Sequence, residues 1–169
     1  MAPSPRKISP NRPARFNNSG MSPKEKLLIA DDNPVNINVL RDALEPHGYE
    51  ILAAPNGDTA LKIAQRALPG LILLDIMMPG LDGLEVCRRL KAIEATREIP
   101  VIFLTARQEM ESLADAFQAG GVDYVTKPFQ PEEILIRIEN HLRTRRLTRE
   151  LTERNSALEQ RTAELTAAN

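Results

Sequence analysis

Residues 70–83 read GLILLDIMMPGLDG, and this stretch decides the fold that the sequence predicts. Four apolar residues in a row, 71–74, lead directly into Asp75. A strand without polar alternation is typical of a parallel sheet that is covered on both faces. The Pro-Gly pair at 69–70 ends the helical segment before it. We therefore expect a buried strand whose last residue is a carboxylate.

The same pairing of a short apolar run with a helical stripe repeats along the chain. Asn33 followed by Pro34 is a helix start, and Asp82 with Glu85 resembles a capping box. Apolar residues then recur at helical spacing, as in Ile37, Leu40 and Leu44, or in Leu113, Ala116 and Phe117. We predict strands over residues 26–31, 49–54, 71–75, 100–105 and 122–126, with helices over 34–45, 60–67, 82–90, 113–118 and from 131 onward.

Five β-α units of this kind predict a doubly wound α/β domain with right-handed crossovers. Periodicity does not determine the order of the strands. Two open arrangements remain at this point, the six-stranded dinucleotide-binding fold and the flavodoxin-like order 2-1-3-4-5. The predicted domain covers residues 25–144 and is flanked by two extensions.

Composition excludes several classes of protein. The chain has 169 residues with 4% aromatic residues and no Trp, which argues against a nucleic-acid reader built on stacked bases. Its single cysteine, Cys87, allows neither an internal disulfide nor a cysteine metal cage, which favours a cytoplasmic location. The longest uncharged apolar stretch, residues 99–106, is too short to span a membrane, and no signal peptide is recognisable.

The two extensions differ in character. Residues 1–24 contain five Lys or Arg, no acidic residue and five prolines, so we predict a disordered basic tail. Residues 145–169 continue the last helix without any Gly or Pro. Leu151, Leu158 and Leu165 recur every seven residues, opposite a line of polar Thr148, Asn155 and Thr162. This pattern favours a weak two-stranded coiled coil and a homodimer, and the alternative is a solvated helix that frays.

Polar side chains follow the predicted strands where each strand ends. Asp31 and Asp32 follow the first, Asp75 ends the third, Thr105 ends the fourth and Lys127 follows the fifth. In the order 2-1-3-4-5 the three carboxylates would share one crevice, where they repel one another unless a cation is bound. Hard oxygen ligands select Mg²⁺, or Mn²⁺ in its place. A carboxylate is also a nucleophile towards phosphorus.

These residues lie in four motifs that resemble the receiver domain of two-component response regulators. The motifs are ADDN at 30–33, LDIMMPGLDG at 74–83, LTA at 104–106 and DYVTKPF at 123–129. The resemblance covers residues 25 to about 144 and implies the flavodoxin-like order 2-1-3-4-5. It also implies a partner, a histidine kinase or phosphotransfer protein that donates a phosphoryl group.

The resemblance assigns a role to each matching residue. Asp75 matches the phosphoacceptor. Asp32 matches the direct ligand of Mg²⁺, Asp31 matches a ligand that commonly acts through water, and the backbone carbonyl of Met77 is a further ligand. On the other side of the site, four residues match the switch machinery: the Thr105 hydroxyl, the Ala106 amide, Lys127 with a cis bond to Pro128, and Tyr124, which turns inward when Thr105 moves.

The resulting interpretation is a phosphorylation switch without an external substrate, which acts through the last helix. A phosphatase with an aspartyl intermediate usually carries an acid two residues after the nucleophile, where this chain has Met77. Only 25 residues follow residue 144, too few for a helix-turn-helix domain, so we expect no direct DNA binding. The alternative is a receiver fragment whose kinase, nucleotide-cyclase or DNA-binding output lies elsewhere. His47 and His141 have no partner at metal or relay spacing.

Overall fold

The computed structural model describes residues 24–167, and the tail predicted over residues 1–24 lies almost wholly outside this range. Five strands and five α-helices alternate along the chain, as the sequence predicts. The strands are β1 (Lys26–Ala30), β2 (Glu50–Ala54), β3 (Leu71–Asp75), β4 (Val101–Thr105) and β5 (Asp123–Thr126). The helices are α1 (Pro34–Leu44), α2 (Gly57–Ala67), α3 (Gly83–Ala92), α4 (Leu113–Gln118) and α5 (Pro131–Ala167), with 3₁₀ turns η1 (Glu45–His47) and η2 (Arg107–Ser112).

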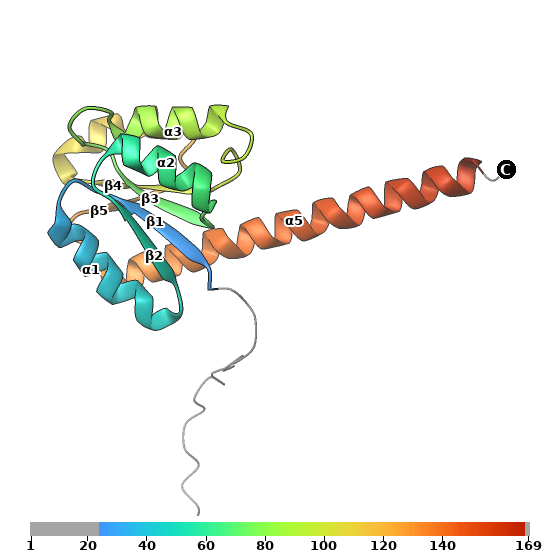
Figure 1. Ribbon diagram of the computed structural model, residues 1–169, viewed down its shortest axis with the longest axis horizontal. Helices are drawn as coiled ribbons and strands as arrows, with labels where there is room; N and C mark the ends of the chain where they lie inside the picture. Colours follow the sequence, from blue (N-terminus) through green and yellow to red (C-terminus); the bar gives the residue numbers. More distant parts are fainter. Residues whose placement is uncertain (1–23, 168–169) are drawn as a thin grey trace, which may run out of the picture.

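The strands form one parallel sheet in the order β2-β1-β3-β4-β5. This settles the choice that periodicity left open in favour of the flavodoxin-like order. Every residue of β3 and β4 is buried, because helices cover both faces of the sheet. In Figure 1, α1 and α5 lie on one face of the sheet, and α2 and α3 lie on the other.

Two apolar clusters hold these layers together. One cluster joins alternate strand residues such as Leu28 and Leu74 to α2, α3 and α4, and it includes Cys87 as a small core residue. The other joins Leu27 and Leu73 to α1 and α5. Because successive strand residues point to opposite faces, unbroken apolar runs supply both clusters at once.

The predicted helix starts are confirmed. The side chain of Asn33 accepts a hydrogen bond from the Val35 amide at 2.9 Å, and Pro34 occupies the first turn of α1. Asp82 Oδ1 accepts from the Glu85 amide at 2.9 Å, so Asp82 is an N-cap. The Glu85 carboxylate faces Arg88 and Arg89, at 3.4 and 3.2 Å.

The fourth helix lies where the sequence predicts it, over residues 113–118. It has only six residues, and the turn η2 precedes it. Ala116 is buried in the core, but Phe117 is 49% exposed. A helix this short buries a narrow face, so only one of the two neighbouring apolar residues reaches the sheet.

The last helix is continuous for 37 residues. Only about its first third packs against the sheet, through the buried side chains of Ile134, Ile138 and Leu142. Beyond Leu142 the helix leaves the domain and extends away from it (Figure 1). Arg145 ties this exit to the start of β3, because its Nη1 donates to the Gly70 carbonyl at 2.8 Å. Within residues 24–167, no helix has the length and hydropathy that crossing a bilayer requires.

The loop after β3 folds back closely onto the strand end. The Gly83 amide donates to the Ile76 carbonyl at 2.8 Å, and a Cβ at Gly83 would overlap the backbone carbonyl of Asp75. A side chain at this position therefore has to displace the backbone that carries Asp75.

We predict that Gly83→Ala lowers the free energy of unfolding by about 3 kcal/mol, because the added methyl group overpacks this turn. Gly80→Ala is the matched control, since its Cβ meets nothing within 4 Å and only its φ of 79° disfavours a side chain. We expect Gly80→Ala to lower the free energy of unfolding by only about 1 kcal/mol. Urea unfolding measures both, and equal losses would contradict the steric explanation.

Candidate functional site

The order of the strands brings three carboxylates together. β1 and β3 are neighbours with Ala30 opposite Leu74, so the residues that follow them meet at one edge of the sheet. One carboxylate oxygen from each of Asp31, Asp32 and Asp75 lies within 4.8 Å of the others. Asp31 is fully buried and Asp75 is 2% exposed, whereas Asp32 is exposed to solvent. The crowding that the sequence predicts is therefore present.

Lys127 bridges two of these carboxylates. Its ammonium lies 3.4 Å from Asp31 Oδ2 and 3.2 Å from Asp75 Oδ1. Burial of the ammonium group opposes its charge, but the carboxylates of Asp75 and Asp31 outweigh this effect and raise the pKa of Lys127. The sequence places Lys127 near the site but does not predict this double ion pair.

Asp75 is held in an environment that favours its neutral form. Burial, followed by the negative charge of Asp31, raises the pKa of Asp75 from 3.8 to about 7, while Lys127 acts in the opposite direction. A second cation beside the carboxylate would favour its ionised form. The three carboxylates are hard oxygen donors, and a single lysine offsets only part of their negative charge, so the site fits a small divalent cation.

Asp31 is oriented by the beginning of α1. Its Oδ1 accepts from the Asn33 amide at 2.9 Å, and its Oδ2 accepts from Asn36 Nδ2 at 3.1 Å. Asn36 is a site residue that the sequence analysis did not identify. Its position in the first turn after the Asn33 cap is the signal that could have indicated it, since that turn faces the end of β1.

A second group of residues lies at the end of β4. Thr105 is fully buried, and its hydroxyl oxygen lies 3.1 Å from the Ala106 carbonyl oxygen. The Ala106 amide donates to Glu109 Oε2 at 3.1 Å. Glu109, in η2, was not identified from the sequence. The peptide bond between Lys127 and Pro128 is cis, as the resemblance implied.

Tyr124 packs on the face of the sheet that α2, α3 and α4 cover, opposite the face that α5 covers. It is half-buried in β5, and its ring meets the ring of Phe117 edge to face, with centroids 6.4 Å apart. The side chain of Met77 is 60% exposed, which agrees with a rim position. Its backbone carbonyl stays a predicted metal ligand.

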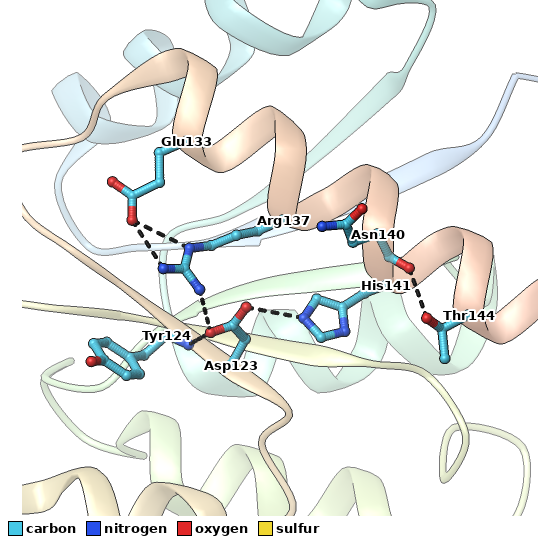
Figure 2. Close-up of polar contacts among 7 residues, drawn as sticks. All are labelled: Asp123, Tyr124, Glu133, Arg137, Asn140, His141 and Thr144. Atoms are coloured by element: carbon cyan, nitrogen blue, oxygen red, sulfur yellow. Dashed lines mark hydrogen bonds and ion pairs between the residues drawn. The ribbon is translucent and has the colours of Figure 1, made fainter.

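A polar cluster joins β5 to α5 (Figure 2). Asp123 accepts from Arg137 Nη1 at 2.7 Å and contacts His141 Nε2 at 3.0 Å, while Arg137 also pairs with Glu133 at 3.1 Å. The sequence indicates no partner for His141 at metal or relay spacing, and it does not indicate this contact with Asp123. The two residues lie 18 positions apart, and only the packing of α5 beside β5 brings them together.

The chain is thus a flavodoxin-like α/β domain with an acidic site at the ends of β1 and β3, and comparison with known proteins identifies its family. The protein-family model of the response regulator receiver domain matches residues 27–139 of the chain. The chain belongs to this family. Receiver domains bind Mg²⁺ at an acidic pocket, here Asp31, Asp32 and Asp75, and they interact with histidine kinases or phosphotransfer proteins.

Two curated relatives show the extent of the match. The chain is 37% identical over 132 residues to the response regulator PleD of Caulobacter vibrioides, which covers 78% of this chain and 29% of PleD. It is 44% identical over 118 residues to the transcriptional regulatory protein ResD of Bacillus subtilis, which covers 70% of this chain and 48% of ResD. The chain thus spans half or less of the length of these relatives.

Solved structures agree with the fold. A response regulator from Chloroflexus aurantiacus superposes with a TM-score of 0.68 at 34% identity, covering 71% of this chain and 98% of its own. The receiver domain of the sensor histidine kinase PA1611 from Pseudomonas aeruginosa has a TM-score of 0.66 at 32% identity, with the same coverage of both chains. That structure holds a magnesium ion coordinated in its active-site cleft.

The raised pKa of Asp75 predicts a pH dependence in cation-free protein. Because the folded state holds the proton more tightly, the stabilisation from protonated Asp75 is complete below about pH 4 and is lost as the pH rises through about 7. Between these two pH values, the free energy of unfolding of the wild type should therefore fall by about 2–4 kcal/mol relative to that of Asp75→Asn.

Urea unfolding in the presence of a chelator measures this difference from pH 4 to pH 8. Asp82→Asn is the control, because Asp82 is exposed and Asn also serves as an N-cap. Parallel pH curves for the wild type and Asp75→Asn would contradict the assigned environment of Asp75.

Proposed function

We propose that the chain is a phosphorylation switch in which Asp75 accepts a phosphoryl group from a histidine kinase or phosphotransfer protein. The observation that carries this proposal is the position of Asp75. Its carboxylate ends a buried strand, lies within ligand distance of two further carboxylates and is 3.2 Å from the ammonium group of Lys127. Nucleophile, cation site and a positive charge for the phosphoryl oxygens thus lie together.

Each residue of the site has its own role in the proposed phosphoryl transfer. An Asp75 oxygen forms a bond to phosphorus while the bond from phosphorus to the donor breaks, and the electron pair of that bond stays with the donor. Lys127, the Thr105 hydroxyl and the Ala106 amide then bind phosphoryl oxygens. Asp31, Asp32, Asp75 and the Met77 carbonyl would hold Mg²⁺, or Mn²⁺ in its place. The bound cation would favour ionised Asp75 and offset the charge of the phosphoryl group.

In this proposal the chain itself turns over no external substrate and binds no DNA. It phosphorylates and dephosphorylates only its own Asp75, in the cytoplasm, where the donor phosphohistidine is found. Whole-length relatives carry more sequence than this chain covers, so a kinase, nucleotide-cyclase or DNA-binding output attached to such a receiver is compatible with the same switch.

The test uses a small phosphodonor. Incubation with acetyl phosphate and Mg²⁺ should add one phosphoryl group, seen in the intact mass, and Asp75→Asn should abolish it. Asp82→Asn, on the exposed loop that follows, should label like the wild type. An undiminished adduct on Asp75→Asn, or equal labelling with and without a divalent cation, would overturn the assignment.

We further propose that the signal leaves through α5. Movement of Thr105 towards the phosphoryl group makes room for Tyr124, the neighbour of Asp123 in β5. Asp123 in turn contacts Arg137 and His141 of α5 at 2.7 and 3.0 Å. A shift of β5 is therefore transmitted to a helix that continues as one rod into residues 145–169.

Those residues are suited to pair with a second copy of the chain in a parallel coiled coil. Leu151, Leu158 and Leu165 are 60–65% exposed on one line of the helix. With the leucines at d positions, Arg154 occupies a g position and Glu159 the next e position, the two positions that pair between parallel helices. An antiparallel arrangement would instead bring Arg154 towards Arg161, so the charges favour the parallel dimer.

Leu158→Lys should weaken the dimer at least tenfold, because it places a charge in the apolar seam. Gln160→Lys, on the outer face of the same turn, is the control. Sedimentation with and without beryllofluoride measures association, and Arg154→Glu combined with Glu159→Arg should restore what either change alone weakens. A full chain that stays monomeric in both states at about 100 µM would show that the extension does not pair.

A further inference from the structure

The turn after β4 presents its hydrogen-bond donors to an acidic side chain of the chain itself. Glu109 Oε2 accepts from the Ala106 amide at 3.1 Å. It also lies 3.5 Å from the Thr105 hydroxyl oxygen, which is closer, at 3.1 Å, to the Ala106 carbonyl oxygen. In return, the Glu109 amide donates to the Ala106 carbonyl at 3.0 Å. These are reciprocal contacts across one turn, of the kind found in a capping box.

The sequence explains why the carboxylate takes this place. Ala106 stands where a cap residue with a hydroxyl or carboxylate is usual, and it has no side-chain acceptor. The acid three residues later, Glu109, supplies the acceptor. Glu109 is half-buried, so this is a defined contact and not a freely solvated charge.

The Ala106 amide carries one hydrogen, and so does the Thr105 hydroxyl. Under the proposed function these two groups bind the phosphoryl oxygens on Asp75. Glu109 and the phosphoryl group are both anionic acceptors, and they cannot both accept the single hydrogen of the Ala106 amide. The phosphoryl group would also add about 1.5 to 2 negative charges beside the Glu109 carboxylate.

We infer that Glu109 is an internal stand-in for the phosphoryl group, because it accepts the hydrogen bond of the Ala106 amide until phosphorylation displaces it. This inference rests on the proposed function and adds a residue that controls it. Glu109 acts on the reaction through Thr105 and Ala106 and is therefore a positioning residue. Its departure releases the start of η2, so capture of the phosphoryl group and movement of the turn become one event.

A role limited to capping the turn predicts the opposite effect. Loss of a cap loosens η2 and disorders the Ala106 amide, which would weaken phosphoryl binding. Loss of a competitor frees the amide and strengthens binding. The sign of the change in affinity therefore distinguishes the two roles.

The test compares Glu109→Gln with Glu111→Gln in the full chain. Both substitutions remove one negative charge from η2, but Glu111 is exposed. Beryllofluoride in the presence of Mg²⁺ is the probe, and its affinity is read from the amide resonance of Ala106. We expect Glu109→Gln to lower the dissociation constant about five- to tenfold, the order of one charge-assisted hydrogen bond. Glu111→Gln should stay within about twofold of the wild type.

Acetyl phosphate labelling of Asp75 gives a second readout, and Glu109→Ala should change both measurements in the same direction as Glu109→Gln. Unchanged or weaker beryllofluoride binding by Glu109→Gln, with normal labelling of the wild type, would overturn the role of Glu109 alone. A wild type that neither labels on Asp75 nor binds beryllofluoride would overturn the proposed function, and the role of Glu109 with it.

Discussion

The structure depends on keeping two buried carboxylates side by side. Asp31 and Asp75 lie at the ends of neighbouring strands and are almost completely removed from solvent. Buried like charges are costly unless they are paired or hydrogen-bonded. Lys127 reaches both from the end of β5, and Asn33 and Asn36 supply hydrogen bonds from α1. β5 and α1 must therefore be placed so that Lys127, Asn33 and Asn36 can reach these two carboxylates.

This constraint also explains which features the sequence predicts. Apolar runs without alternation indicate buried parallel strands, and the polar residues that interrupt them mark the strand ends, so Asp31, Asp32, Asp75, Thr105 and Lys127 could be named in advance. The strand order could not be derived from periodicity, because the apolar pattern of a buried strand is the same whichever strands it pairs with. It came from the resemblance of the motifs, and the structure and the family match agree with it.

The residues that the sequence analysis missed have partners that local patterns do not indicate. His141 and Asp123 meet only because α5 packs beside β5, and the double ion pair of Lys127 joins three strands. Asn36 and Glu109 are close in sequence to their partners, but many polar residues in first turns simply face solvent. The exposure of Phe117 could not be predicted for a related reason, since helical spacing does not tell how much of a helix reaches the sheet.

Three sets of contacts lie along the proposed route from the acidic site to the last helix. The Ala106 amide donates to Glu109, the Tyr124 ring meets the half-exposed Phe117 ring edge to face, and Asp123 contacts both Arg137 and His141. A ligand shifts an equilibrium only by its difference in affinity for the two states. If the phosphoryl group has to displace Glu109, the hydrogen bond that Glu109 loses offsets part of the hydrogen-bond energy that the phosphoryl group gains. The free energy that is left to shift the equilibrium is therefore smaller. The helix extension therefore has to be weakly paired if so modest a difference is to change its association.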